Sequence, residues 1–178
     1  MESDYFDIFD IEPSFNVDQK LLKQRYFELS KQYHPDFNLH LSEEEQHEKM
    51  MQSSKINEAL KVLVDDDLLM AYLLKEYGFH GEETKEVLPP EFLMEMMDLN
   101  EQVMEVEMSF SEKALAEATG ILEKAMNEIQ SKVDPYLTRD PRGLSKEEWL
   151  KLKEFHFKKR YLLRIRKKLN TLAHPKEK

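Results

Sequence analysis

The sequence has no cysteine among its 178 residues. Disulfides, thiolate metal ligands and a cysteine nucleophile are therefore excluded, and the composition fits a reducing compartment. Glycine is also scarce, with four residues, whereas leucine, lysine and glutamate are abundant and methionine occurs ten times. This composition favours helices over sheets and predicts an all-α fold.

Long apolar runs are missing as well, since no stretch approaches the roughly 20 residues that are needed to span a bilayer. The opening sequence Met-Glu-Ser-Asp lacks the basic region of a signal peptide and the arginine-rich character of a transit peptide. The expectation is a cytoplasmic protein that does not engage a membrane.

Positive charge is scarce in most of the chain. The net charge of −10 divides unevenly, because residues 151–178 carry 11 Lys or Arg against 2 Glu, whereas residues 1–150 carry 15 against 34. An acidic body argues against broad nucleic-acid binding. The basic terminal segment could bind phosphate, but pairing with acidic helices beside it is the preferred interpretation, and no nucleic-acid partner is predicted.

Residues 1–77 predict a helical hairpin with short helices around it. Asp18 is a good N-cap for a helix that ends at His34, because a residue before proline is pushed out of the α region. Ser42 and Glu45 form a capping-box pattern that opens the next helix. Two long helices joined by a short polar loop are expected to lie antiparallel.

The second half predicts three further helices beyond a linker at 78–88. Prolines 89 and 90 open the first of them in the way proline at the first helical position does. Two capping-box patterns open the second and third helices: Ser109 with Glu112, and Ser145 with Glu148. Residues 89–178 are therefore expected to form a three-helix bundle.

The tripeptide His34-Pro35-Asp36 stands where the first long helix must end. It follows a helix with four basic side chains, which are Lys20, Lys23, Arg25 and Lys31. Proline fixes the loop backbone, so the flanking imidazole and carboxylate are held outward with little entropy left to lose on binding. The plainer alternative is a helix-stop loop in which the two side chains only cap and solvate.

No catalytic or metal-binding set is predicted. His34, His40 and His47 are loosely spaced around the loop, without an i,i+4 pair and without cysteine. Carboxylates abound, but they are expected as solvated helix faces, and no pair is singled out. The chain is therefore not expected to be an enzyme, and no metal or cofactor is predicted.

The predicted helix at 90–108 has two apolar stripes where folding needs only one. The stripe expected to face the bundle consists of Phe92, Met96, Leu99, Val103 and Val106. The second stripe consists of Leu93, Met97, Met104 and Met108, with Met94, Glu101 and Asp98 beside it. Methionine-rich surfaces suit adaptable partner binding, although a third helix or a dimer could also bury this stripe.

The first half resembles the J-domain family. The resemblance rests on Asp4–Phe9, on the run from Arg25 to Asp36 that contains the tripeptide, and on Ile56–Ala59 with Leu63. It implies that the loop and the basic helix contact the nucleotide-binding domain of a DnaK-type chaperone and stimulate its ATP hydrolysis. The implied contact residues are Lys20, Lys23, Arg25, Lys31, His34, Pro35 and Asp36. Many J domains have lysine where this chain has Phe37, which weakens the expected charge complementarity.

The whole plan of the chain resembles the HscB family of iron–sulfur cluster assembly co-chaperones. The resemblance rests on Phe92-Leu93-Met94-Glu95 in the first helix beyond the J domain and on a basic, aromatic last helix. It implies that the C-terminal domain binds an IscU-type cluster scaffold and delivers it to an HscA-type chaperone, with the cluster belonging to the scaffold. The implied contact residues are Leu93, Met94, Met97, Asp98, Glu101 and Tyr161.

Two other interpretations stay open at this level. The chain could be a J-domain co-chaperone for a different client, with the methionine-rich stripe as a dimer or other client interface. It could also be a purely structural helical hairpin protein in which the tripeptide is accidental. The first differs from the HscB interpretation in its client, and the second predicts no effect on any chaperone ATPase.

Overall fold

The computed structural model describes residues 4–38, 40–79 and 88–174. These residues form helices joined by turns, and the described ranges contain no strand. The prediction of an all-α chain is confirmed.

The helices group into two compact units. The first consists of Met1–Gly78 with Leu137–Leu144, and the second consists of Phe79–Tyr136 with Ser145–Lys178. The domain limits drawn from the sequence, 1–77, 78–88 and 89–178, stay a prediction. Most of the predicted linker, residues 80–87, lies outside the described residues.

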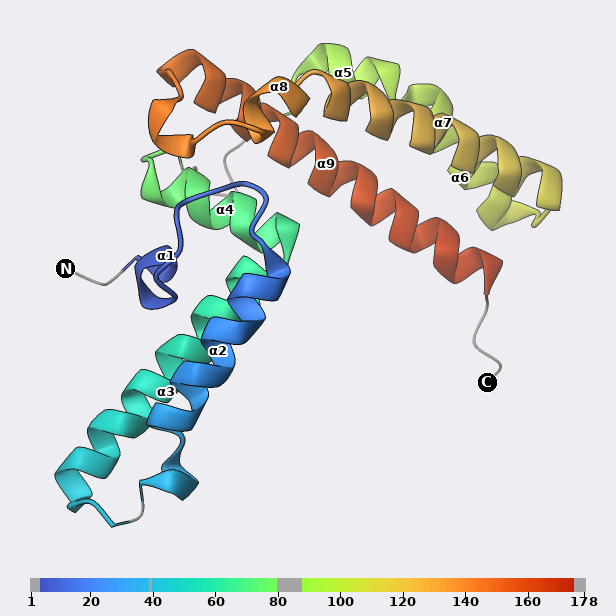
Figure 1. Ribbon diagram of the computed structural model, residues 1–178. Coiled ribbons are helices and arrows are strands. Elements are labelled where there is room, and N and C mark those ends of the chain that lie inside the picture. Colours follow the sequence, from blue (N-terminus) through green and yellow to red (C-terminus); the bar gives the residue numbers. More distant parts are fainter. Residues whose placement is uncertain (1–3, 39, 80–87, 175–178) are drawn as a thin grey trace. The chain divides into compact units, whose positions relative to one another are not determined.

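An antiparallel hairpin of α2 (Gln19–Tyr33) and α3 (Glu43–Leu63) forms the body of the first unit, as Figure 1 shows. The Asp18 carboxylate caps α2, because it accepts hydrogen bonds from the first backbone N–H groups of that helix. Ser42 and Glu45 form the predicted capping box at the start of α3. Hydrogen bonds from Ser42 hold the pKa of the Glu45 carboxyl below its usual value.

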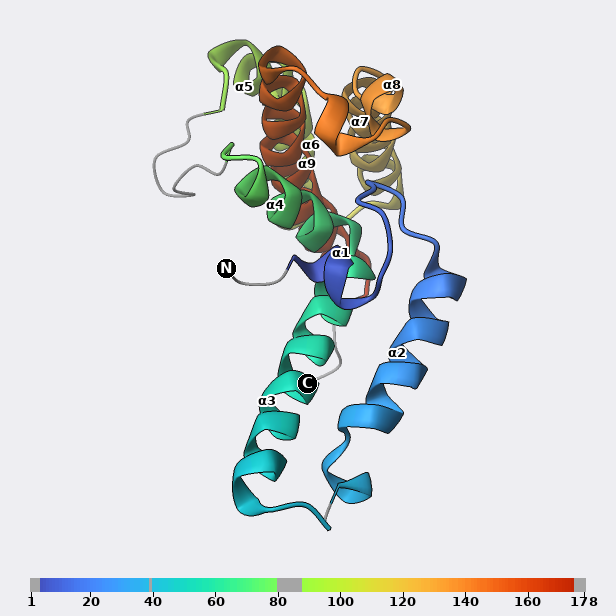
Figure 2. The same ribbon diagram turned by 60° about the vertical axis from the view of Figure 1, so that its left-hand side comes forward.

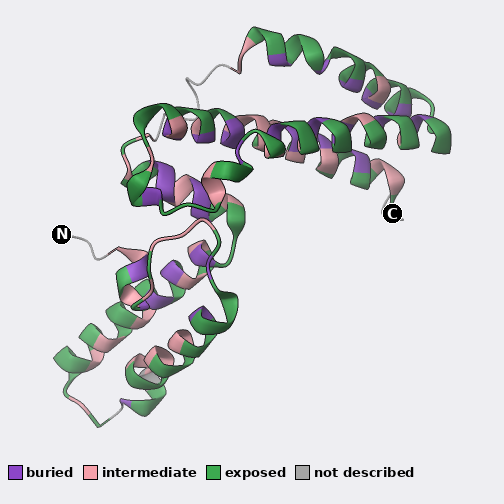
Figure 3. Ribbon diagram, turned by 45° about the horizontal axis from the view of Figure 1, so that its top comes forward, coloured by how far each residue is buried: buried purple, intermediate pink, exposed green. Residues whose placement is uncertain are grey.

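The core of the first unit lies at the end of the hairpin remote from the loop. The short helices α1 (Tyr5–Ile8) and α4 (Asp66–Glu76) cover that end. Its large, fully buried apolar side chains include Phe6, Phe9, Leu22, Leu63 and Leu73. Figure 3 shows that the half of the hairpin next to the loop is almost entirely exposed or half-buried. The loop end therefore has little apolar packing of its own.

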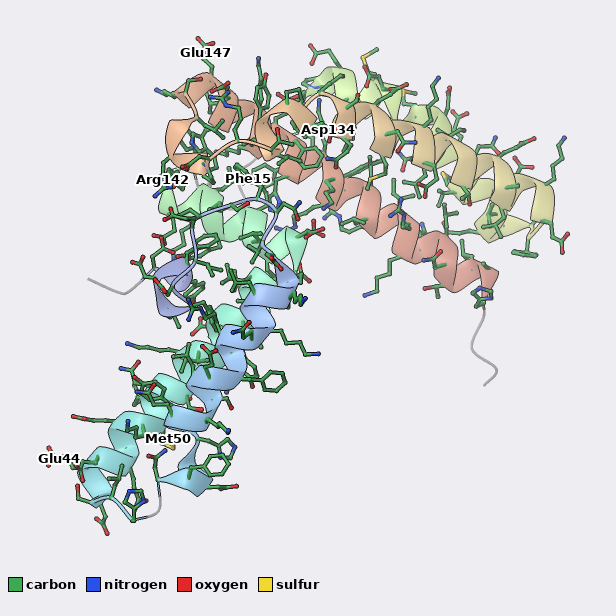
Figure 4. The ribbon with its side chains drawn as sticks, viewed as in Figure 1. Phe15, Glu44, Met50, Asp134, Arg142 and Glu147 are labelled. Atoms are coloured by element: carbon green, nitrogen blue, oxygen red, sulfur yellow. The ribbon has the colours of Figure 1, made fainter. Side chains whose placement is uncertain are left out.

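The segment Leu137–Leu144 is bound to the first unit by charge as well as by packing. Within it, Pro141 is fully buried, and Asp140 caps a one-turn 3₁₀ helix. The Arg142 guanidinium, labelled in Figure 4, lies 2.7 Å from a carboxylate oxygen of Asp140 and 2.7 Å from one of Glu12. These hydrogen bonds raise the pKa of Arg142 above its usual value.

Three long helices form the second unit, as predicted. They are α6 (Met97–Met108), α7 (Glu112–Ser131) and α9 (Lys146–Ala173), and two short helices flank them, α5 (Pro90–Glu95) and α8 (Asp134–Leu137). Figures 1 and 2 both show α7 running alongside α9. Buried alanine and leucine on α7 face this core, and the predicted Ser145–Glu148 capping box opens α9. A single core therefore holds the bundle together.

Two local predictions for the second unit are wrong. Ser109 does not cap α7, because α6 continues to Met108 and leaves Ser109 as its C-cap. The N-cap is Ser111, whose hydroxyl accepts a hydrogen bond from the backbone N–H of Ala114 at 3.1 Å. The helix expected at 90–108 is also divided, because Met96 leaves helical geometry at φ −87° and ψ 3°. Neither change moves an apolar residue to the other face.

Candidate partner-binding surfaces

The His-Pro-Asp loop has a fixed shape that depends on a buried amide. Helix α2 ends at Tyr33, and a single 3₁₀ turn, Pro35–Phe37, follows; the side chain of Pro35 lies outside the described part of the chain. The Asn38 side-chain amide donates to the carbonyl oxygens of Gln32 at 3.1 Å and His34 at 2.8 Å. Asn38 is 8% exposed, so this amide closes the loop from inside. No sequence pattern indicated this role.

The His34 imidazole is oriented by the loop backbone. The N–H of Asp36 donates to His34 Nδ1 at 3.2 Å, which assigns the neutral tautomer with its proton on Nε2. The Asp36 carboxylate lies 3.8 Å from the same Nδ1. The Asp36 side chain is 81% exposed. The loop thus presents a hydrogen-bond donor and an adjacent carboxylate to a partner.

The basic residues of α2 do not share one face. Lys20, Lys23 and Lys31 are exposed and lie within an arc of about 80° that also contains His34. Arg25 lies roughly 160° from the centre of that arc. Its guanidinium pairs instead with Asp10 at 3.1 Å and Glu28 at 3.5 Å. The structure therefore joins the three lysines to the loop and separates Arg25 from them.

The second apolar stripe of α5 and α6 is exposed. The exposed fractions are 40% for Leu93, 70% for Met94 and 56% for Met97. The opposite stripe is buried in the bundle: Phe92, Met96, Leu99, Val103 and Val106. Asp98 and Glu101 are exposed beside the stripe. Packing within the second unit therefore leaves an apolar surface bordered by carboxylates.

Tyr161 of α9 lies at the edge of this surface, where Asn100 holds it. No sequence pattern had indicated Asn100. The Asn100 amide donates to the Tyr161 hydroxyl at 2.8 Å, and that hydroxyl donates back to the Asn100 side-chain oxygen at 3.2 Å. The Tyr161 ring also meets Phe92 edge-on, with centroids 5.7 Å apart. Asn100 and Tyr161 are 61 positions apart, so no local signal could have paired them.

The basic last helix pairs in part with acidic neighbours, as expected. Lys168 of α9 lies 2.8 Å from the Glu107 carboxylate of α6, and Arg166 lies 2.7 Å from the Glu123 carboxylate of α7. These pairs are partly exposed, so each contributes little to stability. They account for some of the positive charge at the C-terminal end without a nucleic-acid partner.

Within 4–38, 40–79 and 88–174, no group of three or more His, Asp or Glu side chains is placed to hold a metal ion. In the same ranges, no helix has the length and apolar character to cross a bilayer.

Comparison with known proteins finds one family match in each half of the chain, and the second match also includes the segment 137–144 that the structure groups with the first unit. Residues 4–72 match the DnaJ domain family, and residues 88–170 match the family described as the HSCB C-terminal oligomerisation domain. The human iron–sulfur cluster co-chaperone protein HscB is 32% identical over 173 residues, which cover 97% of this chain and 69% of the human protein. The chain belongs to the HscB family.

The solved structures agree with this assignment to the HscB family. The crystal structure of human co-chaperone protein HscB superposes with a TM-score of 0.78 at 29% identity, covering 98% of this chain and 84% of the human one.

The co-chaperone protein HscB homolog of Neisseria meningitidis is 39% identical over 104 residues. That match covers 58% of this chain and 63% of the Neisseria protein. The predicted J domain and the predicted helical C-terminal domain are both confirmed as family features.

Proposed function

We propose that this chain is an adaptor that brings an IscU-type iron–sulfur scaffold to a DnaK- or HscA-type chaperone and stimulates the chaperone's ATPase. The observation that carries the proposal is that two exposed surfaces of opposite chemistry lie on two different compact units. One is polar and cationic, around His34, and the other is apolar, around Met94 and Met97. Membership of a family whose human member is named an iron–sulfur cluster co-chaperone supports the choice of partners.

The chaperone contact is assigned to the loop and the lysine face of α2. The loop offers the His34 Nε2–H as a donor and the Asp36 carboxylate as an acceptor, both already oriented before binding. Preorganised groups lose little entropy when a partner docks. Lys20, Lys23 and Lys31 supply a positive field that speeds the encounter with an acidic surface. The chain itself then performs no chemistry, and ATP hydrolysis belongs to the chaperone.

The scaffold contact is assigned to the exposed stripe. Leu93, Met94 and Met97 offer flexible apolar side chains, which adapt to the shape of a partner. The Asp98 and Glu101 carboxylates border them and would select a scaffold surface with cations at matching positions. Tyr161 forms one edge of the exposed stripe, where Asn100 holds its ring against Phe92.

The separation of the two surfaces gives the decisive experiment. His34→Gln should abolish stimulation of the chaperone ATPase and leave scaffold affinity unchanged. Met94→Ala combined with Met97→Ala should weaken scaffold binding and leave stimulation in the absence of scaffold unchanged. The measurements are steady-state ATPase rates with and without scaffold, scaffold titrations and thermal unfolding of each variant. If both variants lost both activities while remaining folded, the two-surface proposal would be wrong.

The competing proposal is a J-domain co-chaperone for another client, or one whose stripe joins two copies. This alternative is supported because the exposed stripe extends beyond the residues assigned to the scaffold: Met104 is 58% and Met108 is 85% exposed. A pull-down with recombinant IscU-type scaffold separates the two clients. Sizing chromatography of the Met94→Ala, Met97→Ala variant beside the wild type tests for a dimer.

A further inference from the structure

An exposed phenylalanine stands in the middle of the lysine face of α2. Phe27 is 59% exposed, and its ring touches only the neighbouring Tyr26 ring among the described aromatic contacts, with centroids 5.9 Å apart. The helix packs in the hairpin through other positions, such as the fully buried Leu22 and the half-buried Tyr26. Folding of the hairpin therefore does not account for an aromatic ring at this position.

Helix geometry surrounds this ring with positive charge. Lys23 and Lys31 lie one turn before and one turn after Phe27, while Lys20 and His34 lie two turns away on the same face. Glu28 is the only acidic residue in α2, and it lies toward the other side of the helix, where it pairs with Arg25. A ring in such a setting can reach a partner without first displacing a carboxylate of its own helix.

A second exposed ring continues this surface across the loop. Phe37 is 63% exposed, and its ring centroid lies 5.7 Å from that of His34. Phe27, His34 and Phe37 thus follow one another from the helix to the 3₁₀ turn. We call these three residues the aromatic ridge. Lysine ammonium groups border the ridge along α2.

We propose that Phe27 and Phe37 are apolar anchors of the chaperone contact, and that the chaperone presents an apolar depression bordered by carboxylates to receive them. This inference rests on the proposed function and refines it. Exposed lysine–carboxylate pairs steer encounters but add little affinity. Aromatic side chains that become fully desolvated at the centre of an interface carry most of its binding energy. The lysines thus speed association, and the ridge holds the complex.

The test is a titration of the stimulated ATPase without scaffold. Phe27→Ala should raise the co-chaperone concentration for half-maximal stimulation about tenfold, as expected for loss of an interface anchor. The maximal rate should stay at the wild-type value, because His34 and Asp36 are intact. The salt dependence should also be unchanged, since no charge is removed. Phe37→Ala should shift the half-maximal concentration in the same direction.

A second substitution at the same position separates an apolar contact from an electrostatic one. Phe27→Lys adds a fourth lysine to the face but removes the ring. The inference predicts weaker stimulation at low concentration, as for Phe27→Ala. If Phe27→Lys instead reached half-maximal stimulation at a lower concentration than the wild type, the chaperone surface at this point would be purely acidic, and the inference would be overturned.

Phe110→Ala is the matched control, because Phe110 is 55% exposed and lies in the second unit. It should titrate like the wild type. Circular dichroism and thermal unfolding should show all variants folded, since each ring is more than half exposed. Wild-type titration by Phe27→Ala would overturn the inference and leave the proposed function standing. Failure of the wild type itself to stimulate a DnaK- or HscA-type ATPase would overturn both.

Discussion

The loop end of the hairpin and the α5–α6 stripe are both exposed, but different forces shape them. The loop has almost no apolar packing, and a hydrogen-bonded amide, a backbone N–H and a capping box hold it. The stripe is the outer side of helices whose inner side is buried in a bundle. The loop therefore presents oriented polar groups beside the exposed rings of the aromatic ridge, whereas the stripe presents adaptable apolar side chains.

This difference also predicts different dynamics. Few buried apolar contacts support the half of the hairpin next to the loop, as Figure 3 shows, so this half should open locally at a low free energy. The opposite side of the helix that bears the stripe is buried, with Leu99 and Val106 almost fully inside the bundle. The stripe should therefore open only when the bundle unfolds. Hydrogen exchange would place the two regions at opposite ends of the stability range.

The largest expected effect contrasts two leucines on the consecutive helices α5 and α6. Leu99→Ala removes a side chain that is 0% exposed and should lower the free energy of unfolding by about 2–5 kcal/mol. Leu93→Ala removes one that is 40% exposed and should lower it by less than about 1 kcal/mol. Urea denaturation measures both. Leu93→Ala should instead weaken scaffold binding, and an equal loss of stability in the two variants would show that the stripe belongs to the core.

The next effect tests the polar construction of the loop. Asn38→Ala leaves the Gln32 and His34 carbonyl oxygens without their buried donor, which costs about 1–3 kcal/mol. Because that part of the hairpin opens locally, the loss should appear as faster hydrogen exchange around the loop and as weaker ATPase stimulation. Scaffold affinity should not change. Wild-type stimulation by this variant would mean that the chaperone itself imposes the loop shape.

The next, smaller effect is the salt dependence of the two contacts. Raising the ionic strength from about 0.05 M to 0.3 M shortens the screening length to well under about 10 Å. The concentration for half-maximal ATPase stimulation should then rise several-fold, because the proposed chaperone contact includes Lys20, Lys23 and Lys31. Scaffold affinity should fall less, since apolar contacts dominate that contact and only Asp98 and Glu101 add charge to it. Equal salt sensitivity in the two titrations would contradict the contrast between the surfaces.

The smallest expected effect concerns the edge of the stripe. Tyr161→Phe removes the hydroxyl that bonds to Asn100 but keeps the ring against Phe92. The free energy of unfolding should fall by about 0.5–1.5 kcal/mol, and scaffold affinity should fall by less than about threefold. Tyr161→Ala is the control that removes the ring as well. If the Phe variant bound scaffold as weakly as the Ala variant, the hydroxyl itself would contact the scaffold.

Local sequence signals predicted much of the fold. Asp18, the Ser42–Glu45 box and the Ser145–Glu148 box all cap the helices that they were expected to cap. The Ser109–Glu112 pattern failed because it competed with Ser111, and only the continuation of α6 to Met108 decided between them. A capping pattern fixes where a helix can begin, not whether the preceding helix has already ended.

The candidate sites were predictable to the extent that they follow helix periodicity. The spacing of apolar residues placed Leu93, Met94 and Met97 away from the stripe that packs in the bundle, but only the structure showed that they are exposed. The same periodicity places Arg25 on another face from the three lysines and Phe27 among them. The sequence prediction, however, considered only the basic residues. The roles of Asn38 and Asn100 had no such signal, because amides occur everywhere on helical surfaces.

The sequence by itself determined the helices, their apolar faces and the position of the His-Pro-Asp loop, because caps, proline and periodicity act over a few residues. Tertiary structure alone decided three other features: the pairing of Tyr161 with Asn100, the closure of the loop by Asn38, and the grouping of Leu137–Leu144 with the first unit. Each depends on groups that the fold brings together. Hydrogen bonds and ion pairs form where donors and acceptors meet in space, and local spacing does not fix that meeting.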